Sequence, residues 1–190
     1  MSKILILANN AGGLYNFRSE LVCELIKCNF EVYFAVPQPL ENKKVQLLIA
    51  AGAKYIQTHV DRRGSNPFKD LRLTITYKKI IKDTNPDVIL TYTVKPNIYG
   101  TYAASRYSKP IIMNITGIGS SLASSNLKHI VKNMYKYACD RAKIVFFQNR
   151  GNRDFFLKNN IVKGKNIRLI PGSGVNINKY VPLPRTTKDN

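Results

Sequence analysis

The amino-acid sequence predicts an α/β protein built on a doubly wound parallel sheet of about seven strands. Three observations carry this prediction. Short apolar runs recur along all 190 residues, as is typical of strands that are buried on both faces of a sheet. Segments with the spacing of amphipathic helices separate these runs. Strands that alternate with helices in this way form right-handed βαβ units, and such units assemble into Rossmann-like sheets.

The first strand is expected at residues 3–8, where the chain is continuously apolar. Six further runs resemble it in length and in their content of branched and aromatic residues. These runs cover residues 32–36, 55–58, 88–92, 111–115, 144–147 and 167–170. Pro171 ends the last run, and the following Gly172-Ser173-Gly174 turn frees the backbone to change direction.

The first helix is expected around Phe17, because Phe17, Leu21 and Leu25 begin an apolar stripe, and Asn16 is its expected N-cap. Five more segments have helical spacing and are bounded by residues that start or stop helices. These segments cover residues 41–51, 67–83, 97–107, 126–140 and 150–159. Pro67, for example, suits the first turn of a helix.

The formal charge of +19 comes from 30 basic and 11 acidic residues. Such an excess attracts phosphate-bearing partners, namely nucleic acid, anionic lipid or a pyrophosphate-linked substrate. Charge alone does not choose among them, and the lysine-rich composition of proteins from A/T-rich genomes is an alternative explanation for part of the excess. No apolar run approaches the roughly 20 residues of a membrane-spanning helix, so we expect a soluble or peripheral protein.

Cysteine and histidine usage favours a reduced compartment and metal-free chemistry. The three cysteines, Cys23, Cys28 and Cys139, are odd in number and contain no C-x-x-C pair, so we expect no disulfide framework and a cytoplasmic protein. The two histidines, His59 and His129, lie on different predicted elements without companions at metal-ligand spacing. We therefore expect no metal site.

The loops that follow the strands are the places to look for chemistry, because ligands of doubly wound sheets bind at the carboxyl ends of the strands. Gly12 and Gly13 open a helix directly after the first strand, which allows backbone N–H groups to approach an anionic ligand. A tight turn that needs glycine only for packing is the alternative. The pair is not a G-x-G-x-x-G fingerprint, and no acidic residue closes the second strand, so a nicotinamide dehydrogenase is disfavoured.

Two more loops lie at the same predicted edge. The loop at residues 116–120 carries two glycines and two hydroxyls, which suit sugar or phosphate oxygens but also suit the simple end of a strand. Lys95 is expected on the ligand-facing side, Asn97 is expected to cap the next helix, and the small Gly100 would let that helix lie close to the sheet.

The order of these motifs resembles the N-terminal half of bacterial family 4 glycosyltransferases, in particular those that extend lipid-linked oligosaccharides for capsule, O-antigen or protein glycosylation. The resemblance covers nearly the whole chain. Its motifs are Gly12-Gly13, Phe17-Arg18, Val36-Pro37, Ser65-Asn66-Pro67 and residues 95–100, 116–120 and 172–176.

The resemblance implies one half of a GT-B enzyme. Such an enzyme transfers a sugar from a nucleotide-sugar donor to an undecaprenyl-diphosphate-linked saccharide acceptor, with retention of configuration and without a metal or other cofactor. Residues 1–171 would be the acceptor-side domain, and residues 172–190 would begin the linker to a donor-binding domain that this chain lacks. That domain would follow in a longer protein or belong to a separate chain, and the present chain alone would be inactive.

The resemblance also implies where substrates bind. The donor-facing cleft would be lined by Gly12, Gly13, Thr116, Gly117 and Gly119. Acceptor-binding residues would be Asn16, Arg18, Lys95 and Asn97. Many relatives carry a histidine in or near the 116–120 loop, and this chain has none there.

If the resemblance holds, we expect two basic helices to hold the protein on the inner face of the cell membrane. Lys128, Lys132 and Lys136 are spaced along one face of the segment 126–140, beside an apolar side that includes Ile130 and Val131. Lys78, Lys79 and Lys82, beside Tyr77, Ile80 and Ile81, form a second candidate. Each basic group near an anionic membrane contributes on the order of 1 kcal/mol. The alternative is that these lysines are simply solvated.

Two other classes of protein stay open. A nucleic-acid-binding module would use the same charge, but the sequence lacks helix-turn-helix, zinc-finger and RNP patterns, so we expect no nucleic-acid partner. A non-catalytic nucleotide-binding or scaffolding protein is the second alternative, and it would need a docking surface for a partner.

Overall fold

The computed structural model describes residues 1–60, 66–118, 128–178 and 180, and it confirms the predicted α/β class. Seven strands form one parallel sheet in the order β3-β2-β1-β4-β5-β6-β7. The strands are β1 Lys3–Leu7, β2 Glu31–Val36, β3 Lys54–Gln57, β4 Val88–Tyr92, β5 Ile111–Ile115, β6 Ile144–Phe147 and β7 Ile167–Leu169. The order reverses between β1 and β4, and this reversal is the point where doubly wound sheets bind ligands.

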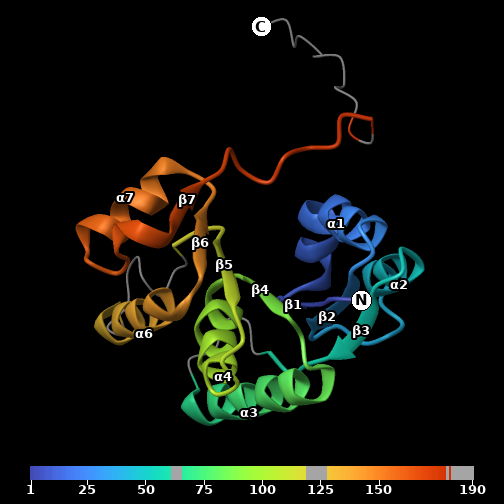
Figure 1. The fold of residues 1–190 in the computed structure, drawn as a ribbon, viewed down its shortest axis with the longest axis horizontal. Coiled ribbons are helices and arrows are strands. Elements are labelled where there is room, and N and C mark those ends of the chain that lie inside the picture. The colour runs from blue at the N-terminus through green and yellow to red at the C-terminus, as the bar shows by residue number, and fades with distance from the viewer. Residues whose placement is uncertain (61–65, 119–127, 179, 181–190) are drawn as a thin grey trace, which may run out of the picture.

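The helices cover the two faces of the sheet unequally (Figure 1). On one face, α1 (Ala11–Lys27) and α2 (Lys43–Ala50) pack on β1 and β2. On the other face, α3 (Pro67–Thr84) and α4 (Thr101–Ser105) pack on β1, β4 and β5, while α6 (Lys128–Arg141) and α7 (Arg150–Lys158) pack on β5 and β6. On the α1 side, β4 contributes Leu90 and Tyr92 to the core beneath α1, whereas no helix of the described part of the chain lies over β5 and β6.

Alternation along the strands produces these two cores. Ile4 and Ile6 point into the core beneath α1, whereas Leu5 and Leu7 point into the core above α3 and α4, and all four side chains are buried. Continuous apolar runs were thus a correct signal for strands covered on both faces.

The first helix begins six residues earlier than expected, and Asn16 lies inside it. The N-cap is Asn10, which has an extended backbone and accepts a hydrogen bond from Gly13 N at 2.8 Å. The prediction that Asn16 caps this helix was wrong, because Asn10 stands closer to the end of β1 and its carboxamide already satisfies a first-turn N–H.

The expected cap at Asn97 was also wrong. Lys95 already has helical backbone angles (φ −67°, ψ −47°), so the chain is helical before Asn97, which lies within a π-helical turn, η1 (Pro96–Gly100). The expected role of Gly100 is confirmed, since a Cβ there would lie 2.8 Å from Leu7 Cδ1 and 3.3 Å from Thr91 Cγ2. Only a glycine lets η1 lie this close to the sheet.

A short 3₁₀ turn, η2 (Gly164–Asn166), directly precedes β7. After β7 the chain leaves the sheet through residues 170–178 toward α1 (Figure 1). Asn176 Nδ2 lies 3.3 Å from Glu20 Oε1 on α1. Within the described residues, none of the helices combines the length and the apolar character needed to cross a membrane.

Candidate functional site

A cavity of about 330 Å³ lies where β1, β4, β5 and β6 end, at the reversal of strand order. We call it the strand-end cleft. Its wall consists of residues that follow these strands and of the first turns of α1. They are Ala8, Asn9, Asn10, Gly13, Leu14, Phe17, Arg18, Tyr92, Thr93, Thr116, Gln148 and Ser173.

The cleft brings together three of the predicted substrate-contacting residues, Gly13, Thr116 and Arg18. Gly12 and Gly117 are not part of its wall, and Gly119 lies outside the described residues. Loops more than one hundred residues apart in the sequence therefore meet at one edge of the sheet, as the parallel topology predicts.

The two glycines of α1 have different structural roles. A Cβ on Gly12 would lie 2.9 Å from Asn10 Oδ1, so glycine at this position makes room for the cap. A Cβ on Gly13 would meet the same oxygen at 3.8 Å, an ordinary contact, so the cap makes no such demand of Gly13. Gly13, unlike Gly12, borders the cleft. Its missing side chain leaves cavity space.

Most of the first-turn N–H groups of α1 are already occupied. Ala11 N donates to Gln38 Oε1 at 2.7 Å, and Gly13 N donates to the Asn10 cap at 2.8 Å. Of the first three N–H groups, only that of Gly12 has no partner among the described residues. The Asn10 cap therefore already uses the Gly13 N–H that was expected to face an anionic ligand.

Arg18 is the only cation in the wall of the cleft among the described residues. Its side chain is 8% exposed, its Nη1 donates to Phe17 O at 2.5 Å, and its guanidinium lies 4.9 Å from the centre of the Tyr92 ring. None of the ion pairs among the described residues includes Arg18. An arginine stays ionised, and a buried charge without a counterion is unfavourable, so this position favours an anionic ligand.

Arg18 also borders a second, larger cavity, which the sequence did not reveal. This α1 groove has a volume of about 1,020 Å³ and extends from α1 along β4 to the faces of β5 and β6 that no described helix covers. Apolar side chains from α1 and the sheet form most of its wall, and the chain after β7 forms its rim. The apolar residues that line the groove include Phe17, Leu21, Leu25, Leu90, Ile112, Phe146 and Val175. The exposed Asn16 lies at this groove and not in the strand-end cleft.

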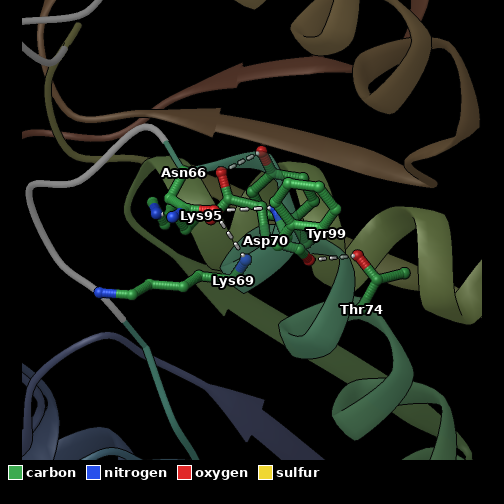
Figure 2. Close-up of polar contacts among 7 residues, drawn as sticks. Asn66, Lys69, Asp70, Thr74, Lys95 and Tyr99 are labelled. Atoms are coloured by element: carbon green, nitrogen blue, oxygen red, sulfur yellow. Dashed lines mark hydrogen bonds and ion pairs between the residues drawn. The ribbon is translucent and has the colours of Figure 1, made fainter.

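Lys95 is held by a carboxylate that the sequence did not identify (Figure 2). Lys95 Nζ donates to Asp70 Oδ1 of α3 at 2.5 Å, and the Tyr99 hydroxyl donates to Asp70 Oδ2 at 2.8 Å. The Lys95 and Asp70 side chains are 12% and 11% exposed. Burial, together with the hydrogen bond to Asp70, raises the pKa of the Tyr99 hydroxyl above its usual range. Lys95 does not line the strand-end cleft, and its charge is neutralised within the protein.

Asn97 is fully buried and ties η1 to β5, because its Nδ2 donates to Asn114 O at 3.0 Å. The nearby Thr93 has a left-handed backbone (φ 73°), which is rare for a branched residue and indicates a constrained turn. Three buried side-chain atoms in this region have no partner among the described residues: Thr93 Oγ1, Gln148 Nε2 and Asn97 Oδ1. Thr93 and Gln148 belong to the cleft wall, as does Arg18, so two of these unpaired groups belong to residues that border the cleft.

Potential metal ligands do not gather in the part of the chain that the structure describes, where no three histidine, cysteine, aspartate or glutamate side chains form a group that could hold an ion. The chemistry that the cleft offers is a buried cation, unpaired hydroxyl and amide groups, and space beside a glycine.

Comparison with known proteins gives a curated relative and several solved structures. The chain is 27% identical over 187 residues to the Campylobacter jejuni N,N'-diacetylbacillosaminyl-diphospho-undecaprenol alpha-1,3-N-acetylgalactosaminyltransferase, an alignment that covers 95% of this chain and 49% of the relative. The chain thus spans about half the length of the curated relative it matches.

Solved structures share the fold. A glycosyltransferase from Rickettsia africae superposes with a TM-score of 0.67 at 19% identity, over 93% of this chain and 44% of that one. Anabaena Alr3699/HepE in complex with UDP and glucose superposes with a TM-score of 0.67 at 16% identity, over 97% and 47%. The UDP-GlcNAc 2-epimerase of Neisseria meningitidis, with a TM-score of 0.64 at 11% identity over 88% and 46%, shows that the fold also serves another reaction.

A family model is more specific than the fold. The model described as glycosyl transferase 4-like matches residues 3–149, which include every described residue of the cleft wall except Ser173. The chain belongs to the glycosyl transferase 4-like family, and its sheet is a Rossmann-like domain of the GT-B type.

Proposed function

We propose that this chain is the acceptor-side domain of a glycosyltransferase that moves a sugar from a nucleotide-sugar donor to an undecaprenyl-diphosphate-linked saccharide, in the synthesis of a surface polysaccharide or glycan. The name of the Campylobacter relative specifies a diphospho-undecaprenol acceptor, and the family match covers the cleft. On this proposal the reaction retains the configuration of the donor sugar and uses no metal ion, as the family resemblance implies.

The observation that carries the proposal is the uncompensated charge of Arg18. Its guanidinium lies in the wall between the strand-end cleft and the apolar α1 groove, with no carboxylate partner among the described residues. A diphosphate that links a sugar to a lipid provides negative charge between a polar group and an apolar one. Charge-assisted hydrogen bonds from arginine to phosphate are strong and directional. We assign Arg18 to the acceptor diphosphate.

The other groups of the cleft suit a sugar. Thr93 Oγ1 and Gln148 Nε2 are buried and unpaired among the described residues, and both residues line the strand-end cleft together with Thr116. Buried polar groups of this kind gain by bonding to sugar hydroxyls, and they reject ligands that lack such hydroxyls. Gly13 leaves the space that the transferred sugar would occupy.

The donor nucleotide would be bound mainly by a second domain, either in a longer protein or in a separate chain. The present chain alone should therefore neither transfer sugar nor bind a UDP-sugar tightly. Since the acceptor carries a lipid, the complete enzyme would work as a peripheral protein on the inner face of the cell membrane.

The test is calorimetry on residues 1–190 with a water-soluble acceptor analogue, a saccharide linked through diphosphate to a short prenyl chain. We expect Arg18→Met to weaken this binding about ten-fold or more, which corresponds to loss of one charge-assisted contact of about 1.5–3 kcal/mol. The matched control is the same saccharide without the diphosphate, whose binding should be equal for both proteins. Equal binding of the diphosphate analogue by wild type and Arg18→Met would refute the assignment, and micromolar binding of a UDP-sugar would contradict the two-domain proposal.

A further inference from the structure

We propose that the outward face of α3 docks on an anionic phospholipid bilayer. This proposal rests on the proposed function, because a lipid-linked acceptor is available only at a membrane. The α3 outer face, as we define it, consists of Phe68, Leu71, Arg72, Ile75, Lys78, Lys79 and Lys82.

The first half of this face is apolar. Phe68, Leu71 and Ile75 are 81%, 60% and 58% exposed. Their spacing of three and four residues places them side by side on one helix face. Single exposed apolar residues are ordinary on protein surfaces, but three large ones in a row on one helix mark an interaction site.

The second half of the same face is basic. Lys79 follows Ile75 by four residues and Lys82 follows it by seven, so both continue the apolar ridge, and Lys78 lies beside them. Arg72 follows Phe68 by four residues. The only acidic residues of α3 are Asp70, which is buried, and the exposed Asp83 near the C-terminal end.

The apolar residues first expected to accompany these lysines belong to the core. Tyr77, Ile80 and Ile81 are 0%, 6% and 1% exposed and pack against β1, β4 and β5. The physical reason is helical phase, since residues adjacent to the lysines in sequence are turned about 100° per residue around the helix and reach the opposite side. The exposed apolar ridge lies one to three turns earlier along α3.

This combination fits a bilayer better than other partners. The cores of protein interfaces are depleted in lysine, whereas lysines at a membrane surface extend their amines to anionic headgroups while their stems lie on the apolar layer. Phosphates of a nucleic acid would contact the lysines but would leave Phe68, Leu71 and Ile75 exposed to water. Apolar insertion and headgroup attraction use both halves of the α3 outer face.

The Asp70 network ties the start of this face to the segment that follows β4. Asp70 points away from the outer face, toward Lys95 and Tyr99, and so anchors the first turns of α3 to the loop that follows β4 (Figure 2). Phe68 and Leu71 flank Asp70 in the sequence, so the apolar ridge begins at the sheet edge where the strand-end cleft opens.

The other predicted membrane helix, α6, lacks such a face among its described side chains. Ile130 is 57% exposed, but Val131 and Met134 pack against the core, and Tyr137 stacks on Tyr102 at 4.2 Å. Lys132 is half-buried and Lys136 is exposed, while the side chain of Lys128 is not among those described. A single exposed apolar residue makes α6 the matched control for α3.

The test is co-sedimentation of residues 1–190 with vesicles of phosphatidylcholine that contain phosphatidylglycerol and no lipid-linked saccharide. One variant changes the ridge (Phe68→Ser, Leu71→Ser, Ile75→Ser), a second reverses the charge (Lys78→Glu, Lys79→Glu, Lys82→Glu), and the control changes α6 (Ile130→Ser, Lys132→Glu, Lys136→Glu). We expect each α3 variant to lose about ten-fold or more in partitioning, and the control to lose much less. The binding that the ridge variant retains should disappear in high salt, because only the charge term is left. Thermal melts check that each variant is folded.

Three results would overturn the proposal. The first is vesicle binding that the α3 variants leave unchanged. The second is duplex DNA binding that the charge variant abolishes and the ridge variant does not, since this would indicate a nucleic-acid surface. The third is self-association that the ridge variant abolishes while vesicle binding persists, since this would indicate a second copy. Vesicles supplemented with the lipid-linked saccharide form a separate arm: if they bind no better than unsupplemented ones, the proposed acceptor loses support while the docking surface stands.

Discussion

The loop after β1 and the loop after β4 end at the same edge of the sheet, and the sequence predicted that both contact a ligand. Among the described residues, the structure leaves the basic residue that follows β1 without a carboxylate partner and pairs the basic residue that follows β4. Arg18, at the second turn of α1, has a buried charge with no carboxylate partner among the described residues, whereas Lys95 has its charge paired with Asp70. The sequence thus predicted the same role for both basic residues. They differ in whether the protein itself already supplies a partner for the charge.

This contrast separates binding from stability. A side chain that the fold satisfies contributes to the free energy of folding, and its loss should destabilise the protein. A side chain that the fold leaves unsatisfied contributes little to folding, and its loss should weaken a ligand instead. Substitutions in the two loops can break this interpretation.

The largest expected effect on stability is at Lys95. Lys95→Met should lower the free energy of unfolding by about 3 kcal/mol, because it leaves the buried Asp70 carboxylate without its cation. Arg18→Met is the matched substitution after β1 and should lower the free energy of unfolding by less than about 1 kcal/mol, since it removes a charge that has no counterion among the described residues. Urea denaturation of both variants measures the difference.

The double variant Asp70→Leu, Lys95→Met controls for lost volume, and it should recover part of the stability because no unpaired charge stays buried. Equal destabilisation by Lys95→Met and Arg18→Met would show that the two loops do not differ as described.

A smaller effect is expected at Tyr99, which donates to the same carboxylate. Tyr99→Phe should lower the free energy of unfolding by about 1.5 kcal/mol, the usual contribution of a hydrogen bond to a charged group. The raised pKa of Tyr99 adds a pH dependence. Above pH of about 10 the unfolded chain loses the phenol proton while the folded chain keeps it, so stability should fall as pH rises through this range.

Unfolding measured from pH 8 to 11 checks the sign, with Tyr99→Phe as the reference that lacks this contribution. If wild type and variant show the same pH slope, the hydrogen bond to Asp70 does not hold the Tyr99 proton.

The smallest effects on stability are expected at the two glycines that follow β1. Gly12→Ala should cost about 1 kcal/mol, the usual value of an N-cap, because the new Cβ would displace the Asn10 carboxamide. Gly13→Ala should cost nothing or stabilise α1 slightly, because alanine favours helix more than glycine does and meets only an ordinary contact.

In the complete enzyme, however, Gly13→Ala should abolish transfer, because its methyl group would project into the strand-end cleft. Thermal melts and a transfer assay on both variants separate the cases. Transfer that survives Gly13→Ala, or that is lost only through unfolding, would make this glycine purely structural.

Much of the fold followed from the sequence. The predicted strands at 88–92, 111–115 and 144–147 coincide with β4, β5 and β6, and the helix expected from Pro67 begins there. Errors fell at the expected N-caps. Asn16 was expected as the cap, but Asn10 performs it, because only the backbone conformation after β1 decides which carboxamide reaches a first-turn N–H.

The candidate site was only partly predictable. Gly13 and Thr116 were identified by their position after strands and Arg18 through the family resemblance, and the structure does bring the three to one cavity. Gln148 and Thr93 were missed, although each also follows a strand, because neither residue type signals binding by itself. The α1 groove was missed because it depends on a helix that is absent from one half of a sheet face among the described residues.

The sequence by itself determined the strands, the helices and their alternation, since hydrophobic period and helix-stopping residues act over a few neighbours along the chain. It also determined that loops far apart would meet, because parallel strands place their carboxyl ends at one edge. Only the tertiary structure decided which polar side chains those loops leave unsatisfied. Asp70 lies 25 residues before Lys95, and their ion pair exists because α3 packs against the segment that follows β4. Pairing of charges depends on distance in space, which spacing along a chain does not encode.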